Sequence, residues 1–108
     1  MSISTTYRGR SRLPGVLVSD YIHKGNTISS LNITVNFNGT IKMAVCADDV
    51  NWEDVGTLVS GQMKTYVLTN PGGNVRYRIV GARNSELMNT YNDNLSYNKP
   101  MVKIEMIE

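Results

Sequence analysis

Four carboxylate side chains lie close together in the middle of the sequence. They belong to Asp48, Asp49, Glu53 and Asp54, with Asn51 among them. Carboxylate and amide oxygens are ligands for Ca²⁺, but this segment lacks the regular Asp spacing of an EF-hand loop. Asp side chains in turns also accept hydrogen bonds from nearby backbone N–H groups. We therefore predict a solvated acidic turn that needs no metal ion.

Residues that commonly act in catalysis are scarce. His23 is the one histidine and Cys46 the one cysteine, which excludes an internal disulfide and most histidine-based schemes. His23 precedes a Lys-Gly-Asn turn signal and is expected to be exposed, whereas Cys46 ends an apolar segment and is expected to be buried. We find no nucleophile–base pair and no glycine-rich phosphate loop. We predict that the protein is not an enzyme and uses no cofactor.

Arginine and tyrosine gather in two segments that are candidates for binding a partner. The first contains Tyr7, Arg8, Arg10 and Arg12. The second contains Arg76 and Arg78, which alternate with Tyr77 and are therefore expected on the opposite face of their strand. Three phosphate contacts would give only weak, salt-sensitive binding to nucleic acid, whereas Tyr and Arg are enriched at protein interfaces. We therefore expect a protein partner and no nucleic acid. Tyr91 and Tyr97, from a polar segment, complete the set of candidates.

The aromatic residues also allow a second interpretation. Rings of this kind can stack on a sugar, and the candidates are Trp52, Tyr66, Tyr77, Tyr91 and Tyr97.

The elements that would position these residues are strands. Val, Thr and Tyr are frequent, Ala is rare, and Asn and Gly recur at short intervals. We expect strands at 16–22, 31–37, 40–46, 55–60, 63–68, 75–80 and 101–107. Turns or breaks are expected at 23–26 and 70–74, and an irregular polar segment at 81–100.

The clearest pattern is the alternation of apolar and polar residues over 31–37 and again over 40–46. The apolar residues are Leu31, Ile33, Val35 and Phe37, followed by Ile41, Met43 and Val45. Alternation predicts strands with one buried face. Asn38-Gly39 lies between the two segments and is favoured in two-residue hairpin turns. The pattern therefore predicts a β-hairpin over 31–46.

These elements predict an all-β fold, an antiparallel, jelly-roll-like β-sandwich of about 7–8 strands with an extended N-terminal arm. A closed barrel is the alternative. We expect residues 1–15 to form the arm, with Pro14-Gly15 as a hinge, and residues 16–108 to form a single domain. The arm should order only on a partner, because it has no apolar periodicity.

Several features of 31–81 occur together in known sandwiches. They are the strand pair that ends near Val45, the acidic turn with Trp52, the Val55-Gly56 step and the Arg-Tyr-Arg-Ile strand at 76–79. This half of the chain resembles galactose-binding-like (discoidin-type) jelly rolls and is similar to small β-sandwich modules of tailed-phage virions. The resemblance implies the architecture and a tryptophan beneath the turn. It carries over no ligand residue, because Val50 stands where the family's turn has glycine.

We expect a non-enzymatic virion structural protein, most specifically a capsid decoration (cement) protein that bridges and stabilises coat subunits of a tailed phage. Its partners would be the major capsid protein or other virion subunits, and we expect a homo-oligomer, either a dimer or a trimer. No apolar run could span a membrane or act as a secretory signal, so we expect synthesis in the host cytoplasm and location in the virion. The alternative is a carbohydrate-binding module, or a tail or baseplate adhesion component, that uses Trp52 and surface tyrosines. A small cytoplasmic partner protein ranks last.

Overall fold

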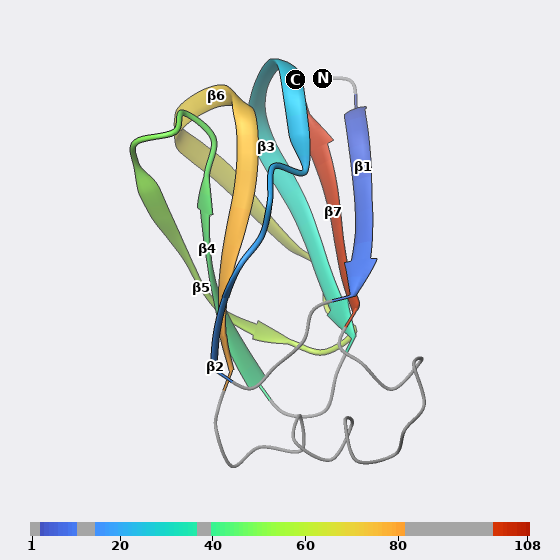
Figure 1. The fold of residues 1–108 in the computed structure, drawn as a ribbon. Coiled ribbons are helices and arrows are strands. Elements are labelled where there is room, and N and C mark those ends of the chain that lie inside the picture. The colour runs from blue at the N-terminus through green and yellow to red at the C-terminus, as the bar shows by residue number, and fades with distance from the viewer. Residues whose placement is uncertain (1–2, 11–14, 37–39, 82–100) are drawn as a thin grey trace.

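The computed structural model describes residues 3–10, 15–36, 40–81 and 101–108, which contain strands and no helix (Figure 1). The strands are β1 (Ile3–Arg10), β2 (Gly15–Val18), β3 (His23–Asn36), β4 (Thr40–Cys46), β5 (Trp52–Val59), β6 (Lys64–Gly81) and β7 (Met101–Ile107). Each pair of neighbouring strands runs antiparallel. The predicted all-β, antiparallel, sandwich-like fold is confirmed.

Two layers of strands share β6. The first layer consists of β1, β7, β3 and the first part of β6, and the second consists of β2, the last part of β6, β4 and β5. β6 pairs with β3 between Lys64 and Val75 and with β4 between Arg76 and Gly81. It therefore passes from one layer into the other, as strands at the corners of sandwiches do.

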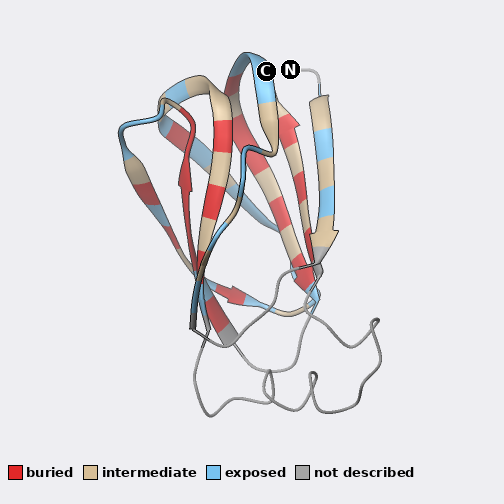
Figure 2. Cartoon of the chain, in the orientation of Figure 1, coloured by how far each residue is buried: buried red, intermediate tan, exposed pale blue. Residues whose placement is uncertain are grey.

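The core lies between the layers and is built from alternate residues of each strand, so buried and less buried positions follow one another along the ribbons (Figure 2). The first layer contributes Leu31, Ile33, Val35, Val102, Ile104 and Met106, and the second contributes Ile41, Met43, Val45, Val55, Leu58, Tyr77 and Ile79. Burying one such side chain stabilises the fold by about 1.5–3 kcal/mol. The buried faces predicted for 31–35 and 41–45 are confirmed, and Val102, Ile104 and Met106 form a third.

The predicted hairpin over 31–46 is wrong. β3 pairs with β6 and β7, β4 pairs with β5 and β6, and the described residues contain no pairing between β3 and β4. The two strands lie in different layers. Alternation reports which face of a strand is buried but does not identify the neighbouring strand. Phe37 and Asn38-Gly39 lie outside the described residues.

The break expected at 70–74 is also wrong, because β6 continues through these residues. Val67 pairs with Ser30 and Gly72 with Ile28, so residues 68–71 stand opposite a single residue of β3. This bulge bends β6 before it passes into the second layer between Val75 and Arg76.

Two glycines permit the close backbone contacts at the bend. A Cβ atom at Gly72 would lie 2.1 Å from the carbonyl oxygen of Ala47, and one at Gly73 would lie 2.2 Å from the carbonyl oxygen of Gly25. Glycine in a strand often marks such an approach of two backbones. The Gly-Gly pair thus has a packing role within a continuous strand.

The N-terminal residues are part of the first layer. β1 pairs with β7 from Ile3 opposite Ile107 to Arg10 opposite Met101. The prediction that strands begin only at Val16 is therefore wrong. β7 provides backbone partners along its edge, which compensates for the weak apolar pattern of this segment.

Some boundaries also differ from those predicted. The segment 16–22 is a strand only as far as Val18, and residues 23–26, expected as a turn, begin β3. β5 begins at Trp52, three residues before the predicted start at 55. The polar segment predicted at 81–100 lies outside the described residues apart from Gly81, which ends β6.

Candidate functional site

The outer face of the second layer brings together the arginines of β6 and the tryptophan of β5. Along β6, Tyr77 and Ile79 are buried, and Arg76, Arg78 and Val80 alternate with them on the opposite face. The second-layer outer face consists of Val16, Val18, Lys42, Ala44, Cys46, Trp52, Asp54, Thr57, Val59, Arg76, Arg78 and Val80. The prediction that the two arginines share one face of a strand is confirmed.

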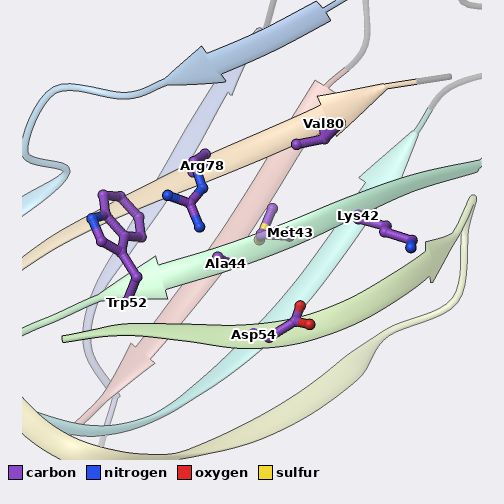
Figure 3. A pocket seen from close by; sticks show the side chains of 7 residues that line it. All are labelled: Lys42, Met43, Ala44, Trp52, Asp54, Arg78 and Val80. Carbon is purple, nitrogen blue, oxygen red and sulfur yellow. The ribbon is translucent and has the colours of Figure 1, made fainter. Parts of the chain in front are cut away.

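Trp52 reaches across β4 to Arg78 (Figure 3), and its ring also lies close to Arg76. Cys46 stands opposite Trp52 in one ladder and opposite Arg76 in the other. Ala44 and Cys46 are small and buried, which leaves room for the indole above β4. The indole centre lies 4.7 Å from Cζ of Arg78 and 5.2 Å from Cζ of Arg76. Trp52 therefore packs on the outer face, and the expected position beneath the acidic turn is wrong.

A second aromatic ring extends this arrangement. Cζ of Arg76 lies 5.4 Å from the ring centre of Tyr21, and Nζ of Lys24 lies 4.5 Å from the same ring. Arg78, Trp52, Arg76, Tyr21 and Lys24 thus alternate as cation and ring, and we call them the cation–aromatic row. One such contact is worth about 0.5–1 kcal/mol at an exposed site. The row therefore keeps each guanidinium close to a ring.

The arginines of the row have no acidic partner within the described residues. Neither the Arg76 nor the Arg78 guanidinium lies within 4.0 Å of a described carboxylate. The ion pair found among the described residues joins Lys103 and Glu105 of the first layer. Nε of Arg76 is covered and finds no hydrogen-bond acceptor among the described groups. Buried donors usually have an acceptor, so this side chain has an unmet capacity for hydrogen bonding.

Asp48 organises the acidic turn. Its Oδ1 accepts hydrogen bonds from the backbone N–H groups of Asn51 (2.7 Å) and Val50 (2.9 Å), and its Oδ2 accepts one from Nδ2 of Asn51 (2.6 Å). These bonds, led by the one from the Asn51 backbone, lower the pKa of Asp48 from 3.8 to about 2. The predicted bonding of turn carboxylates to local N–H groups is confirmed.

Asp49 connects the turn to the cation–aromatic row. It has a positive φ of 68° and accepts hydrogen bonds from the hydroxyl of Tyr21 (2.5 Å) and from Nδ2 of Asn74 (2.7 Å). The Tyr21 bond is the main cause of the lowered pKa of Asp49, and the charges of Arg76 and Lys24 contribute less. The same bond raises the pKa of Tyr21. Asp49 therefore fixes the ring that lies between the two cations.

Glu53 has a structural role that the sequence did not reveal. It faces inward, where it accepts hydrogen bonds from the hydroxyl of Tyr66 (2.8 Å) and the backbone N–H groups of Thr69 (2.7 Å) and Asn70 (2.8 Å). Burial raises the pKa of Glu53, but these hydrogen bonds outweigh it and leave the pKa below 4.5. The side chain thus ties β5 to the bend of β6. If the sequence analysis had started this strand at Trp52, alternation would have put Glu53 on the same buried face as Val55.

The acidic residues do not converge on a metal site. Asp54 Oδ1 accepts a hydrogen bond from the backbone N–H of Gly56 (3.0 Å), while Asp48, Asp49 and Glu53 bind the separate groups described above. Within the described ranges, no three His, Cys, Asp or Glu side chains gather closely enough to hold an ion.

Tyr7 and Arg8 lie apart from the arginines of β6. Tyr7 packs on the core, with its ring centre 5.9 Å from that of Tyr77 and the two hydroxyls 3.5 Å apart. Arg8 is exposed on the first layer, opposite Lys103. Arg10 ends β1, and its side chain is outside the described part, as are Arg12, Tyr91 and Tyr97. Among the described side chains, the two segments therefore meet at Tyr7 and Tyr77, while Arg8 lies on the other layer from Arg76 and Arg78.

Two of the tyrosines considered for sugar stacking face inward. Tyr77 is 1% exposed, and Tyr66 is half-buried with its hydroxyl on Glu53. Tyr21 and Lys24 were missed by sequence reasoning, although both are part of the row. Their contacts depend on the hydrogen bond to Asp49 and on β6, neither of which a local pattern encodes.

A shallow depression of about 240 Å³ lies beside the row (Figure 3). It is lined by Lys42, Met43, Ala44, Trp52, Asp54, Arg78 and Val80. One side thus carries a guanidinium and an indole, and the other carries a lysine and a carboxylate. Such a lining suits a partner's polar side chain better than an apolar one.

The first-layer outer face is different. It carries Thr34, Lys103 and Glu105, with exposed Ile3 and Val67 toward one end, and Oγ1 of Thr65 donates a hydrogen bond to Oδ1 of Asn32 (2.8 Å). Paired polar side chains of this kind are typical of a solvated sheet face.

No protein-family model and no curated protein matches this chain. Along the described residues, no helix has the length and apolar character required to cross a bilayer.

Proposed function

We propose that this protein is a non-enzymatic structural protein that attaches to a larger assembly through the second-layer outer face. The observation that supports this most strongly is the composition of that face. Val16, Val18 and Val80 are 67%, 51% and 43% exposed, and they adjoin Trp52 and two arginines. Apolar residues beside Trp, Tyr and Arg are the usual composition of interface centres.

The strand register makes the apolar part continuous. Val16 stands opposite Val80, and Val18 stands opposite Arg78, on directly paired strands. Side chains opposite one another in an antiparallel pair lie about 4.5–5.5 Å apart at Cβ. The valines and the cation–aromatic row therefore form one surface, which a partner can cover in a single contact.

The more specific form of this proposal is a decoration (cement) protein of a tailed-phage capsid, bound to the major capsid protein or other virion subunits as a dimer or trimer. It is supported by the small all-β fold and by the resemblance of 31–81 to virion β-sandwich modules. Two features that the resemblance implied are not found in the structure. The strands within 31–46 do not pair with each other, and Trp52 does not lie beneath the acidic turn. The docking face therefore supports the proposal more strongly than the resemblance does.

The test is binding to undecorated capsids, measured as copies bound after sedimentation. Val18→Asp should abolish attachment, because it places a charge among the exposed valines. Thr34→Asp is the matched control on the first layer, beside Lys103, and should bind like the wild type. Wild-type occupancy by a folded Val18→Asp protein would refute the docking face.

Carbohydrate binding at Trp52 remains the second candidate, because the half-buried indole borders the depression. A sugar stacked on the ring would have to compete with the guanidiniums of Arg76 and Arg78. Trp52 is the one tryptophan of the chain, so its fluorescence during a sugar titration reports directly on this site. A saturable response to a neutral sugar would favour this function over attachment to a protein.

A further inference from the structure

We propose that Arg76 and Arg78, held against Trp52, form a receptor for the carboxylates of an acidic segment of the partner protein. This inference rests on the proposed function, since it names the chemistry that the docking face recognises. In this proposal the exposed valines make the apolar contact with the partner, and the two arginines recognise its carboxylates.

The geometry suits a pair of carboxylates. Arg76 and Arg78 are two residues apart on one face of β6, a repeat of about 6.6 Å along a strand. Carboxylates at alternate positions of an extended peptide have the same repeat. One indole lies within cation–π distance of both guanidiniums, and each guanidinium can bind a carboxylate through two parallel hydrogen bonds.

The described carboxylates near the row accept hydrogen bonds from other groups. Asp48 binds the N–H groups of its own turn, Asp49 binds Tyr21 and Asn74, and Asp54 binds the N–H of Gly56. No carboxylate of the described residues pairs with Arg76 or Arg78. The two cations are therefore available for carboxylates supplied by a partner.

The surroundings favour a protein over a nucleic acid. The receptor is flanked by exposed Val18 and Val80, and Asp54 lies on the far side of the depression from Arg78. A phosphate backbone would meet this carboxylate and the valines, and the net charge of the whole chain is only +2. Nucleic-acid surfaces need a broader array of cations. An acidic peptide with apolar residues between its carboxylates fits both parts of the face.

The probe is a capped Glu-Val-Glu-Val-Glu peptide, with Gln-Val-Gln-Val-Gln as its uncharged match, titrated into the full chain at low ionic strength. Fluorescence of Trp52 is the readout. We expect a saturable change with the Glu peptide alone, and a dissociation constant that rises with salt. Arg78→Gln and Arg76→Gln should each weaken binding about tenfold or more, whereas Arg8→Gln, on the first layer, should not.

Arg78→Lys separates shape from charge. A lysine keeps the charge but not the planar fork, so binding should be weaker than in the wild type and stronger than in Arg78→Gln. Melting temperatures identify any variant that fails to fold. If Arg78→Gln does not fold, the affinity of Arg78→Lys is compared with that of the wild type instead. Equal responses to the Glu and Gln peptides, unchanged affinity in Arg78→Gln, or tighter binding of an oligonucleotide would overturn the proposal.

The peptide and capsid experiments fail in distinguishable ways. If Val18→Asp abolishes capsid attachment and Arg78→Gln leaves it unchanged, the docking face stands and the carboxylate receptor is refuted. If the peptide binds as expected and Val18→Asp leaves attachment unchanged, the receptor stands and the proposed attachment through this face is refuted.

Discussion

The outer faces of the two layers are built on similar strands but differ in chemistry. Over much of the first-layer face, polar residues bind one another, such as Thr65 with Asn32 and Lys103 with Glu105, and exposed Ile3 and Val67 lie toward one end. The second-layer face carries arginines that bind rings instead of acids, and these adjoin exposed valines. The second-layer face therefore combines apolar side chains with cations that no described carboxylate pairs, and the first-layer face does not. This difference identifies the face at which a partner is expected.

The inner faces, in contrast, should contribute equally to stability. Ile33 of the first layer and Ile79 of the second are both fully buried in the same core. Replacing either with Ala should lower the free energy of unfolding by about 2–5 kcal/mol, because each leaves a cavity. Urea denaturation measures both. A loss below about 1 kcal/mol in one variant alone would show that its layer does not share the core.

The joint between the layers should be nearly as sensitive. Gly72→Ala places a Cβ against the Ala47 carbonyl and should cost about 1–3 kcal/mol, because backbone must move. Gly61→Ala is the control, since it has a positive φ but open space around its Cα, and should cost about 1 kcal/mol. Equal losses in the two variants would mean that the bend tolerates a side chain.

Glu53 connects β5 of the second layer to the same bend. Glu53→Gln replaces an acceptor oxygen with an amide that opposes backbone N–H donors, which should cost about 1–3 kcal/mol at neutral pH. Glu53→Ala measures the loss of all three bonds. Wild-type stability of the Gln variant would show that these bonds contribute little.

The lowered pKa values of Glu53 and Asp48 predict how the free energy of unfolding depends on pH. The pKa of Glu53 is lowered from 4.5, and that of Asp48 from 3.8 to about 2. A carboxyl with a lower pKa in the folded state stabilises the fold above its unfolded pKa, and the effect is lost as pH falls through the folded pKa. The free energy of unfolding should therefore decline from about pH 4.5 toward pH 2. A smaller decline is expected for Glu53→Gln in parallel urea titrations, and an identical one would contradict this role.

The smallest effect is expected on the first-layer outer face. Lys103→Ala removes a partly exposed ion pair with a separation of 3.9 Å, and the free energy of unfolding should change by less than about 0.5 kcal/mol. A loss above about 1 kcal/mol in thermal or urea unfolding would show that this face is not simply solvated.

The strand faces could be predicted from the sequence, but the strand neighbours could not. Alternation correctly placed Leu31, Ile33 and Val35 on a buried face, because the period of two is a local property. The Asn38-Gly39 signal suggested a hairpin, yet β3 and β4 are in different layers. Pairing depends on long-range packing, including the path of β6 through a Pro-Gly-Gly segment that resembles a break.

The site was predictable to a similar extent. The spacing of Arg76 and Arg78 was enough to place both on one face. Their contact with Trp52 depends on the register of β5 across β4, and on Ala44 and Cys46 being small enough for the indole to lie over them. No local pattern contains that information.

The most direct comparison of the two outer faces uses valine methyl groups. Val18 and Val80 are exposed on the second layer, and Val67 is 70% exposed on the first. Cross-saturation from undecorated capsids to a methyl-labelled, otherwise deuterated protein would report which valines touch the partner. We expect loss of methyl signal at Val18 and Val80 and none at Val67. Loss at Val67 with unchanged signals at Val18 and Val80 would contradict attachment through the second layer.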